Sequence, residues 1–341
     1  MLLAHAEDSA HVQDSSQPSG LKKSRITIIL LVVVVFIVAT SIFLLSGLTS
    51  NSNQNNVPRN TGSELPGAFV IRKVEPATRF EHIHGLAISP ENQSVIYVAT
   101  HTGLVAGFNK SLFEYDWFYI NDERMDITAM LLDIENPRVI YNFGHPTSRE
   151  ETGLRKSLDG GETWELVVSR PDPHEWVQSQ SNPNIMYAVD FPTNVLVRTE
   201  DKGVSWKILQ SPAIVFSIAI NPIDPLDILA GTENGLFRSR DGGLSWEPFA
   251  ERFSGVIVTT VAYDVRNTEI IYVRSFFGLI KSVDGGKSWK DITDGIDIQD
   301  VVRYITVDPS NSDVIYIAAQ DKIYKSINGG DSWILIREPD S

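Results

Sequence analysis

The chain has 341 residues, no cysteine, and 43 acidic against 29 basic side chains, which gives a formal net charge of −14. The absence of cysteine excludes disulfides and thiolate metal sites, and the acidity disfavours binding to nucleic acid or to anionic lipid headgroups. The length suits one large repeat domain or two ordinary domains.

Residues 26–48 form the most hydrophobic stretch, ITIILLVVVVFIVATSIFLLSGL, without a charge or a proline. As a helix that rises ~1.5 Å per residue, it is long enough to span a hydrocarbon core of roughly 30 Å. Because Lys22, Lys23 and Arg25 precede it, the positive-inside rule predicts residues 1–25 as a cytoplasmic tail and the rest of the chain outside the cell. The alternative is a cleaved signal peptide, which the long apolar run and the lack of a clear cleavage site disfavour.

Residues 49–67 are polar, rich in Ser and Asn, and without hydrophobic periodicity. Such a composition predicts a flexible linker. We therefore expect a single-pass protein of the cell membrane, with a transmembrane signal anchor at 26–48 and an extracytoplasmic domain at 68–341.

One eight-residue phrase recurs through this domain, and its final Trp returns every 40–44 residues. A degenerate copy, NKSLFEYDW, ends earlier, at Trp117. The clear copies are SLDGGETW (157–164), TEDKGVSW (199–206), SRDGGLSW (239–246), SVDGGKSW (282–289) and SINGGDSW (326–333).

Short apolar segments with strand character flank each phrase. In the last repeat, for example, VIYIAA (314–319) and KIYKS (322–326) precede the phrase, and WILIR follows as a fourth strand. Four short strands per ~40–45 residues are typical of β-propeller blades. Six such repeats predict an all-β, six-bladed β-propeller over about 82–338, with a seven-bladed ring as the alternative. AFVIRKV (68–74) is predicted to be an added edge strand or a closing element.

The phrase itself is suited to a tight turn between the third and fourth strands. Its acidic side chain can accept hydrogen bonds from backbone N–H groups of the turn, and its glycine supplies a positive φ. A calcium site would need several carboxylates in one loop, and each phrase offers one or two. We therefore predict a structural role for the Asp of four copies and for the Asn that keeps the acceptor oxygen in the last: Asp159, Asp201, Asp241, Asp284 and Asn328.

This phrase resembles the Asp-box (BNR) repeat, S-x-D-x-G-x-x-W, of sialidases, sortilin-type receptors and a photosystem II assembly factor. The resemblance implies a propeller whose Asp-boxes lie on the face opposite the functional one. The strings FEHIHGLA (80–87), YVATHTGL (97–104) and GHP (144–146) also resemble those of exported bacterial and archaeal Asp-box proteins commonly labelled glycosyl hydrolases.

All five histidines of the predicted propeller fall on the opposite face, around the mouth of the central channel. The two imidazoles of EHIHG would lie on one side of a strand, because side chains alternate with period two. They form half of a candidate site for a divalent metal, which the other three histidines could complete. The alternative is that they only hydrogen-bond water and backbone. The five are His82, His84, His101, His145 and His174.

Acidic side chains surround the same mouth, and two of them at a separation of ~5–9 Å could hydrolyse a glycosidic bond. Sialidase activity is disfavoured, because the early F/Y-R-I-P motif of that family is missing and VIRKV (70–74) matches it poorly. The candidate catalytic carboxylates are Glu81, Asp126, Glu150, Glu151 and Asp190.

Three functions stay open at this point. We expect a membrane-anchored module that binds an extracellular protein or glycan at its channel mouth without turnover, with a candidate divalent metal on the histidines. The alternatives are a glycoside hydrolase that uses the mouth carboxylates and a metal-dependent enzyme.

Overall fold

The computed structural model describes residues 71–78, 82–122, 124–146, 152–191, 193–297 and 302–338. The predicted cytoplasmic tail, membrane span and linker (1–67) lie outside these residues. Within them, no helix is long and apolar enough to cross a membrane, and the one helix is a short 3₁₀ turn, η1 (Glu251–Phe253).

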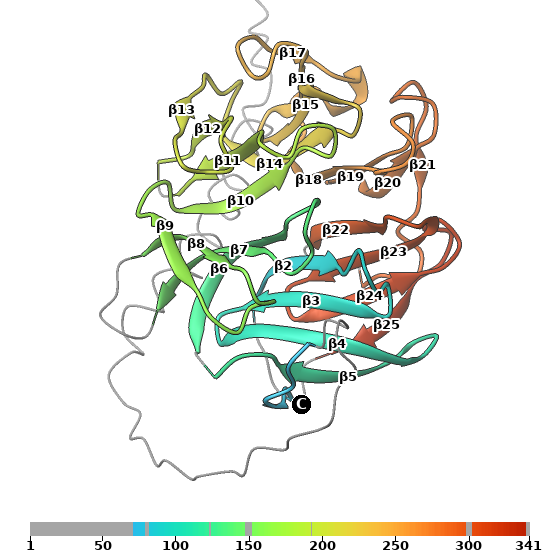
Figure 1. Ribbon diagram of the computed structural model, residues 1–341. Helices are drawn as coiled ribbons and strands as arrows, with labels where there is room; N and C mark the ends of the chain where they lie inside the picture. Colours follow the sequence, from blue (N-terminus) through green and yellow to red (C-terminus); the bar gives the residue numbers. More distant parts are fainter. Residues whose placement is uncertain are drawn as a thin grey trace, which may run out of the picture. The chain divides into compact units, whose positions relative to one another are not determined.

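Six antiparallel sheets surround a central axis, and each sheet is one blade of a β-propeller (Figure 1). From the axis outward, four strands of each sheet follow chain order, and the sheet of blade one carries a fifth strand, β1 (Glu75–Pro76), outside them. Blade one holds β2 (Ile83–Ile88), β3 (Val95–Thr100), β4 (Gly103–Ser111) and β5 (Glu114–Tyr119); blade two holds β6 (Met125–Leu132), β7 (Ile140–Pro146), β8 (Gly153–Ser157) and β9 (Glu165–Val168); blade three holds β10 (Pro173–Gln178), β11 (Met186–Asp190), β12 (Val195–Thr199) and β13 (Lys207–Ile208). Blade four holds β14 (Val215–Asn221), β15 (Asp224–Thr232), β16 (Gly235–Ser239) and β17 (Glu247–Pro248); blade five holds β18 (Val258–Tyr263), β19 (Ile271–Ser275), β20 (Gly278–Ser282) and β21 (Lys290–Asp291); blade six holds β22 (Val302–Asp308), β23 (Asn311–Ala319), β24 (Lys322–Ser326) and β25 (Ile334–Arg337).

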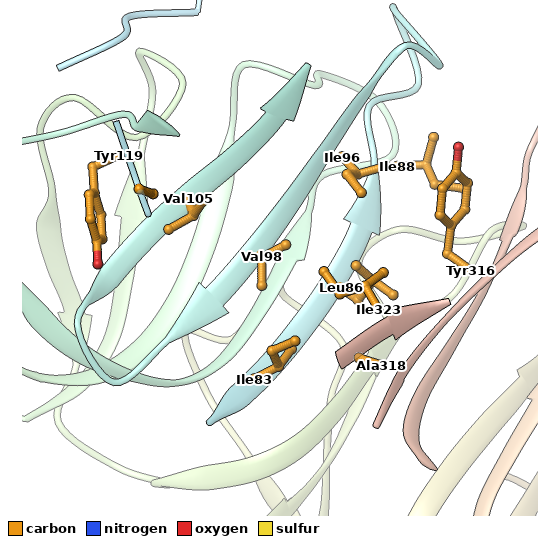
Figure 2. Close-up of a cluster of buried hydrophobic side chains, with 11 residues drawn as sticks. Ile83, Leu86, Ile88, Ile96, Val98, Val105, Tyr119, Tyr316, Ala318 and Ile323 are labelled. Atoms are coloured by element: carbon orange, nitrogen blue, oxygen red, sulfur yellow. The ribbon is translucent and has the colours of Figure 1, made fainter. Parts of the chain in front are cut away.

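The ring closes between blade six and blade one. Each innermost strand contacts the innermost strand of the next blade, and β22 contacts β2. At this junction Leu86 and Val98 of blade one belong to one buried cluster with Ala318 and Ile323 of blade six (Figure 2). Among the described residues, every sheet is built from strands that are consecutive in the chain, so no strand is exchanged between blades to close the ring. The six-bladed prediction is confirmed, and the seven-bladed alternative is wrong.

The predicted turns join the third and fourth strands of blades two to six. In blade two, Asp159 Oδ1 accepts hydrogen bonds from the backbone N–H of Glu162 (3.0 Å) and Thr163 (2.9 Å), and Oδ2 accepts one from Thr163 Oγ1. The serine that opens the phrase, Ser157, accepts from the N–H of Gly161 at 2.7 Å. Asp201, Asp241, Asp284 and Asn328 each accept a hydrogen bond from the backbone N–H four residues later. The carboxylates therefore serve their own turns.

Blade one departs from this pattern. Its third and fourth strands continue into a hairpin at residues 112–113, so the degenerate phrase that ends at Trp117 makes no such turn. The Trp117 ring instead covers Gly107, where a Cβ would lie 2.6 Å from it.

The added edge strand is β1 (Glu75–Pro76), which pairs with β5. The prediction of this strand at 68–74 was wrong for the described residues 71–74. The hydrogen bonding to blade one begins only at the N–H of Val74, and the Lys73 ammonium lies over the Phe108 ring.

Candidate functional site

A β-bulge near the start of every innermost strand shapes the mouth of the channel. In each blade the register of strand pairing skips one residue of the innermost strand, at the equivalent position, so this residue is not matched to one on the second strand. Because a bulge re-aims the side chains beside it, successive residues of these strands can face the axis. Three of the skipped residues, His84, His174 and Arg303, line the channel. The six skipped residues are His84, Thr128, His174, Phe216, Thr259 and Arg303.

The channel holds a cavity of about 340 Å³, mostly walled by the innermost strands. The residues that follow two of the bulges, Glu175 and Tyr304, also line it. This volume lies at the small end of the range of ~300–1,000 Å³ that ligand pockets span.

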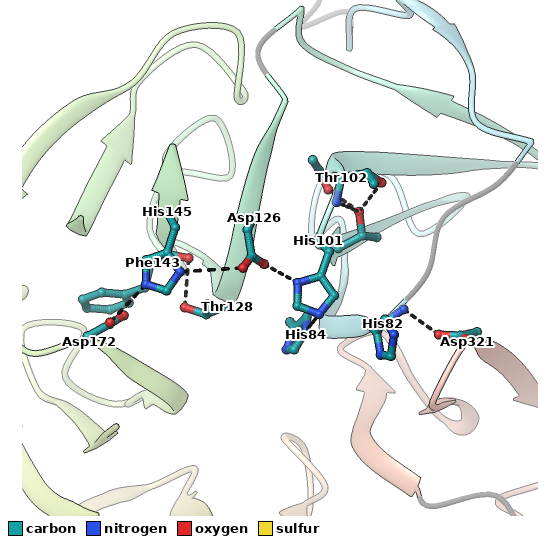
Figure 3. A network of polar contacts seen from close by, with 12 residues as sticks. His82, His84, His101, Thr102, Asp126, Thr128, Phe143, His145, Asp172 and Asp321 are labelled. Atoms are coloured by element: carbon teal, nitrogen blue, oxygen red, sulfur yellow. Dashed lines mark hydrogen bonds and ion pairs between the residues drawn. The ribbon is translucent and has the colours of Figure 1, made fainter. Parts of the chain in front are cut away.

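Three histidines of blade one, His82, His84 and His101, gather at the mouth (Figure 3), and His174 of blade three lies beside His84. Nε2 of His84 and Nε2 of His101 are 3.0 Å apart. The His101 ring centroid lies 4.9 Å from that of His82, and the His84 centroid lies 6.2 Å from that of His174. His174 also packs on Phe191 at 4.4 Å. The histidines predicted from the sequence are therefore close together.

The H-x-H pair does not use strand alternation in the way that the sequence predicts. His82 precedes β2 with a positive φ of 54°, and its N–H donates to Asp321 Oδ1 of blade six at 2.5 Å. His84 is the bulged residue of β2. A left-handed residue followed by a bulge brings both rings to His101.

Asp126 of blade two connects this histidine cluster to His145, which also lies in blade two. Its Oδ1 is 2.5 Å from His101 Nδ1, and its Oδ2 is 3.6 Å from His145 Nδ1. The other nitrogen of His145 lies 3.1 Å from Asp172 Oδ2. His145 is thus held between two carboxylates (Figure 3).

These contacts give the histidines different charge states. Hydrogen bonds to Asp126 and Asp172 raise the pKa of His145 to about 10, so it is a cation at neutral pH. Burial, followed by the charge of His101, lowers the pKa of His84 well below its ordinary value. Burial also lowers the pKa of His174 to about 4. His84 and His174 are therefore neutral.

The candidate catalytic carboxylates differ in their surroundings. Burial opposes ionisation of Asp126, but hydrogen bonds from His101 and His145 outweigh burial and lower its pKa. Asp190 accepts hydrogen bonds from the N–H of Asp172 and from Thr193 Oγ1, which ties the start of β10 to the end of β11. Glu81, Glu150 and Glu151 lie outside the described residues.

Glu175 is a channel carboxyl that the sequence did not single out as a candidate catalyst. Burial raises its pKa to about 7. Its position in the channel follows from the bulge at His174, and an irregularity of this kind has no distinct residue signature in the sequence.

The described residues can hold a divalent metal at one place. His84, His101 and Asp126 present ligand atoms within 4.8 Å of one another. Two nitrogens bound at ~2.05 Å to a tetrahedral ion lie about 3.3 Å apart, and the two Nε2 atoms are 3.0 Å apart. Asp126 stands behind His101, on its Nδ1, as carboxylates do behind metal-bound histidines. Asp172 Oδ1 is buried beside the cluster without a hydrogen-bond partner among the described residues.

The fold and the described site define a six-bladed β-propeller with a histidine-lined channel mouth. No protein-family model matches the chain, and no curated protein matches it. It is similar to the crystal structure of a GH74 enzyme from Niastella koreensis, with a TM-score of 0.55 and 16% identity over 77% of this chain and 46% of that one. An ancestral GH74 enzyme matches with a TM-score of 0.50 and 15% identity over 76% of this chain and 38% of that one.

YCF48 bound to a D1 peptide aligns at a TM-score of 0.47 and 12% identity, over 78% of this chain and 88% of that one. The chain spans less than half the length of the two enzymes. At these identities the GH74 similarity shows the β-propeller fold.

Proposed function

We propose that this chain is a membrane-anchored, extracytoplasmic β-propeller of the Asp-box type, which binds a protein or glycan at its channel mouth. The ligand meets a divalent transition metal held by Nε2 of His84 and Nε2 of His101. The observation that carries the proposal is the 3.0 Å approach of these two nitrogens, with Asp126 behind one of them. Imidazole is the ligand that zinc, copper and nickel share.

A ligand would bind such a metal at the coordination positions that the two histidines leave open. Two protein nitrogens leave at least two positions of a tetrahedral ion open toward the channel. His145 is outside the ligand set. Its Nδ1 faces Asp126 and its Nε2 faces Asp172, so both nitrogens stay protonated, whereas metal ligation needs a neutral ring.

A glycoside hydrolase is the less favoured alternative. The general acid of such an enzyme has a raised pKa and a partner carboxylate nearby. Asp126 is instead held ionised, and Asp190 accepts hydrogen bonds from the Asp172 N–H and from Thr193 Oγ1. Neither of these two described candidates suits the acid role.

Metal titration of the full-length chain in detergent tests the proposal. We expect one Zn²⁺ or Co²⁺ per propeller by calorimetry and elemental analysis, and at least a 100-fold loss of affinity in His84→Ala and in His101→Ala. All variants would carry His5→Ala and His11→Ala, so that the tail histidines do not contribute. His145→Gln is the matched control and should keep the metal.

Ligand binding is then compared on glycan and peptide arrays with and without chelator. Binding that disappears with the metal supports the proposal, and release of sugar from a bound glycan would favour the hydrolase. Folded His84→Ala and His101→Ala proteins with undiminished metal affinity would overturn the metal site. The 3.0 Å contact would then be a hydrogen bond between two histidines.

A further inference from the structure

Glu175 places a carboxyl group in the channel below the histidines. Ser217 Oγ donates to its Oε1 at 3.1 Å, and the backbone N–H of Ile218 donates to the same oxygen at 3.2 Å. Within the described part of the chain, both hydrogen bonds of this carboxyl end on Oε1. Since Glu175 lines the cavity, its Oε2 is left for a molecule that enters the channel.

The charged and titratable groups around this carboxyl are unevenly arranged. His84, His174 and Arg303 lie at the mouth end, and the guanidinium acts on both histidines and on Tyr304. Tyr304 is neutral, and its hydroxyl donates to the His174 carbonyl at 3.4 Å. Among the described residues, no basic side chain is paired with Glu175. Burial, Ser217 and Ile218 set its pKa, and its charge helps to raise the pKa of Tyr304.

This arrangement is half of an ion pair. The two donors on Oε1 favour the ionised carboxylate, whereas burial opposes it and raises the pKa of Glu175 to about 7. An ionised carboxylate inside a protein is costly unless a cation accompanies it. The missing group is therefore positive, and the net charge of −14 favours its arrival.

An ammonium group fits this position better than a metal ion. Ca²⁺ needs six to eight oxygen ligands and Mg²⁺ needs an octahedral set. Among the described residues that line the cavity, the other carboxyl, Asp133, is already paired with Lys202. A primary ammonium brings three N–H donors, and Glu175, Tyr304 and Thr260, which all line the cavity, carry oxygen atoms of the kind that accept them. An unbranched alkyl chain behind it suits the apolar wall of a narrow channel.

We propose that the channel takes an alkylammonium group, from a free amine or from a lysine side chain of a protein partner, and that Glu175 is its counter-ion. This inference rests on the proposed function, in that the group enters through the same mouth. It adds the chemistry of the ligand.

Calorimetry with n-butylamine, on the zinc-loaded full-length chain in detergent, tests the proposal. We expect binding of one amine per chain, no binding of n-butanol, and at least a tenfold loss of amine affinity in Glu175→Gln. Glu233→Gln, which removes the same charge from the loop between β15 and β16, should bind the amine normally. A lysine peptide and its Nε-acetyl form separate the two sources, because a partner lysine requires the peptide to bind more tightly than the free amine.

Zinc affinity separates this proposal from the metal site. Glu175→Gln should bind zinc normally, and this result also shows that the variant is folded. If Glu175→Gln does not fold, Glu175→Asp keeps the charge on a shorter side chain and should bind the amine more weakly than the native chain. Zinc binding without amine binding in the native chain, or equal amine affinity in native and Glu175→Gln proteins, would overturn the alkylammonium site.

Discussion

Asp126 joins two histidines with different roles: His101 is a proposed metal ligand, and His145 is a cation. It fixes the Nδ1 proton of His101, which turns Nε2 toward His84, and it shares His145 with Asp172. One carboxylate thus orients a candidate metal ligand and stabilises a cation.

The substitution Asp126→Asn separates these roles. We expect the pKa of His145, about 10 in the native chain, to fall toward its ordinary value, with Asp172 retaining part of the shift. Zinc affinity should fall by roughly 10–100-fold, as for other carboxylates behind metal ligands. NMR titration of the His145 ring and zinc calorimetry measure the two effects.

The pH dependence of stability has a definite sign. Because the pKa of His145 is raised on folding, its ion pair stabilises the native state below about pH 6.5 and is lost as the pH rises through about 10. Between pH 8 and 10, the melting temperature should therefore fall more steeply with rising pH for the native chain than for Asp126→Asn. Asp190→Asn is the matched control, since Asn keeps the acceptor for the Asp172 N–H. An unchanged His145 titration in Asp126→Asn would contradict the network.

Blade assignment alone locates His84, His101 and His145 around one mouth, because the repeats show where each loop lies. The pairing and the protonation states were beyond such reasoning. They depend on the bulge at His84, on the left-handed backbone of His82, and on Asp126 reaching across from the next blade. Each is a tertiary feature without a local residue pattern.

The turns between third and fourth strands are the repeated elements that support the site from the far side. Their acidic oxygens serve backbone N–H groups of the same turn, and the last blade does this with the amide of Asn328. Charge is therefore dispensable there, whereas an acceptor oxygen is required.

Asp159→Ala should destabilise the propeller by about 1 kcal/mol, because water replaces part of the lost hydrogen bonding at this exposed turn. Asp159→Asn, which copies blade six, should cost less. Thermal and denaturant unfolding measure the difference, and zinc affinity should be equal in all three proteins. A folded Asp159→Ala protein without zinc binding would show that the turn takes part in the site.

Strand positions could be read from the sequence wherever the repeat is regular. The segments GLRKS, VLVRT, GLFRS, GLIKS and KIYKS coincide with β8, β12, β16, β20 and β24. The interpretation failed in blade one, where the hairpin at 112–113 replaces the turn, and at the edge strand, whose pairing begins at Val74. At both places the pairing partner, and not the local pattern, decides the structure.

The whole molecule is closed by packing between its first and last blades. Tyr115 and Tyr316 hydroxyls meet at 2.8 Å, and the Lys325 ammonium donates to the Leu112 carbonyl at 2.8 Å. A ring closed in this way needs every blade, so we expect cooperative unfolding of the propeller as one unit.

The proposed topology predicts that protease added to intact cells cuts within residues 49–67. The released fragment should begin near residue 68 and still bind zinc, because all the proposed ligands lie beyond the cut. Western blotting of the medium and N-terminal sequencing measure this outcome. A cytoplasmic marker protein controls for lysis, and a chain that is cut only after permeabilisation would contradict the extracytoplasmic placement.

The attachment of the N-terminal side has a mechanical consequence. The chain joins blade one through β1, a strand of two residues on the outer edge, and Arg337 of the last blade donates to the Thr78 carbonyl just after it. If the anchor holds as proposed, tension between a bound ligand and the membrane reaches the propeller first at β1. The hydrogen bonds of β1 to blade one would therefore bear the force before the core of any blade does. Force would therefore detach this edge first and lengthen the tether while the ring and its mouth stay intact.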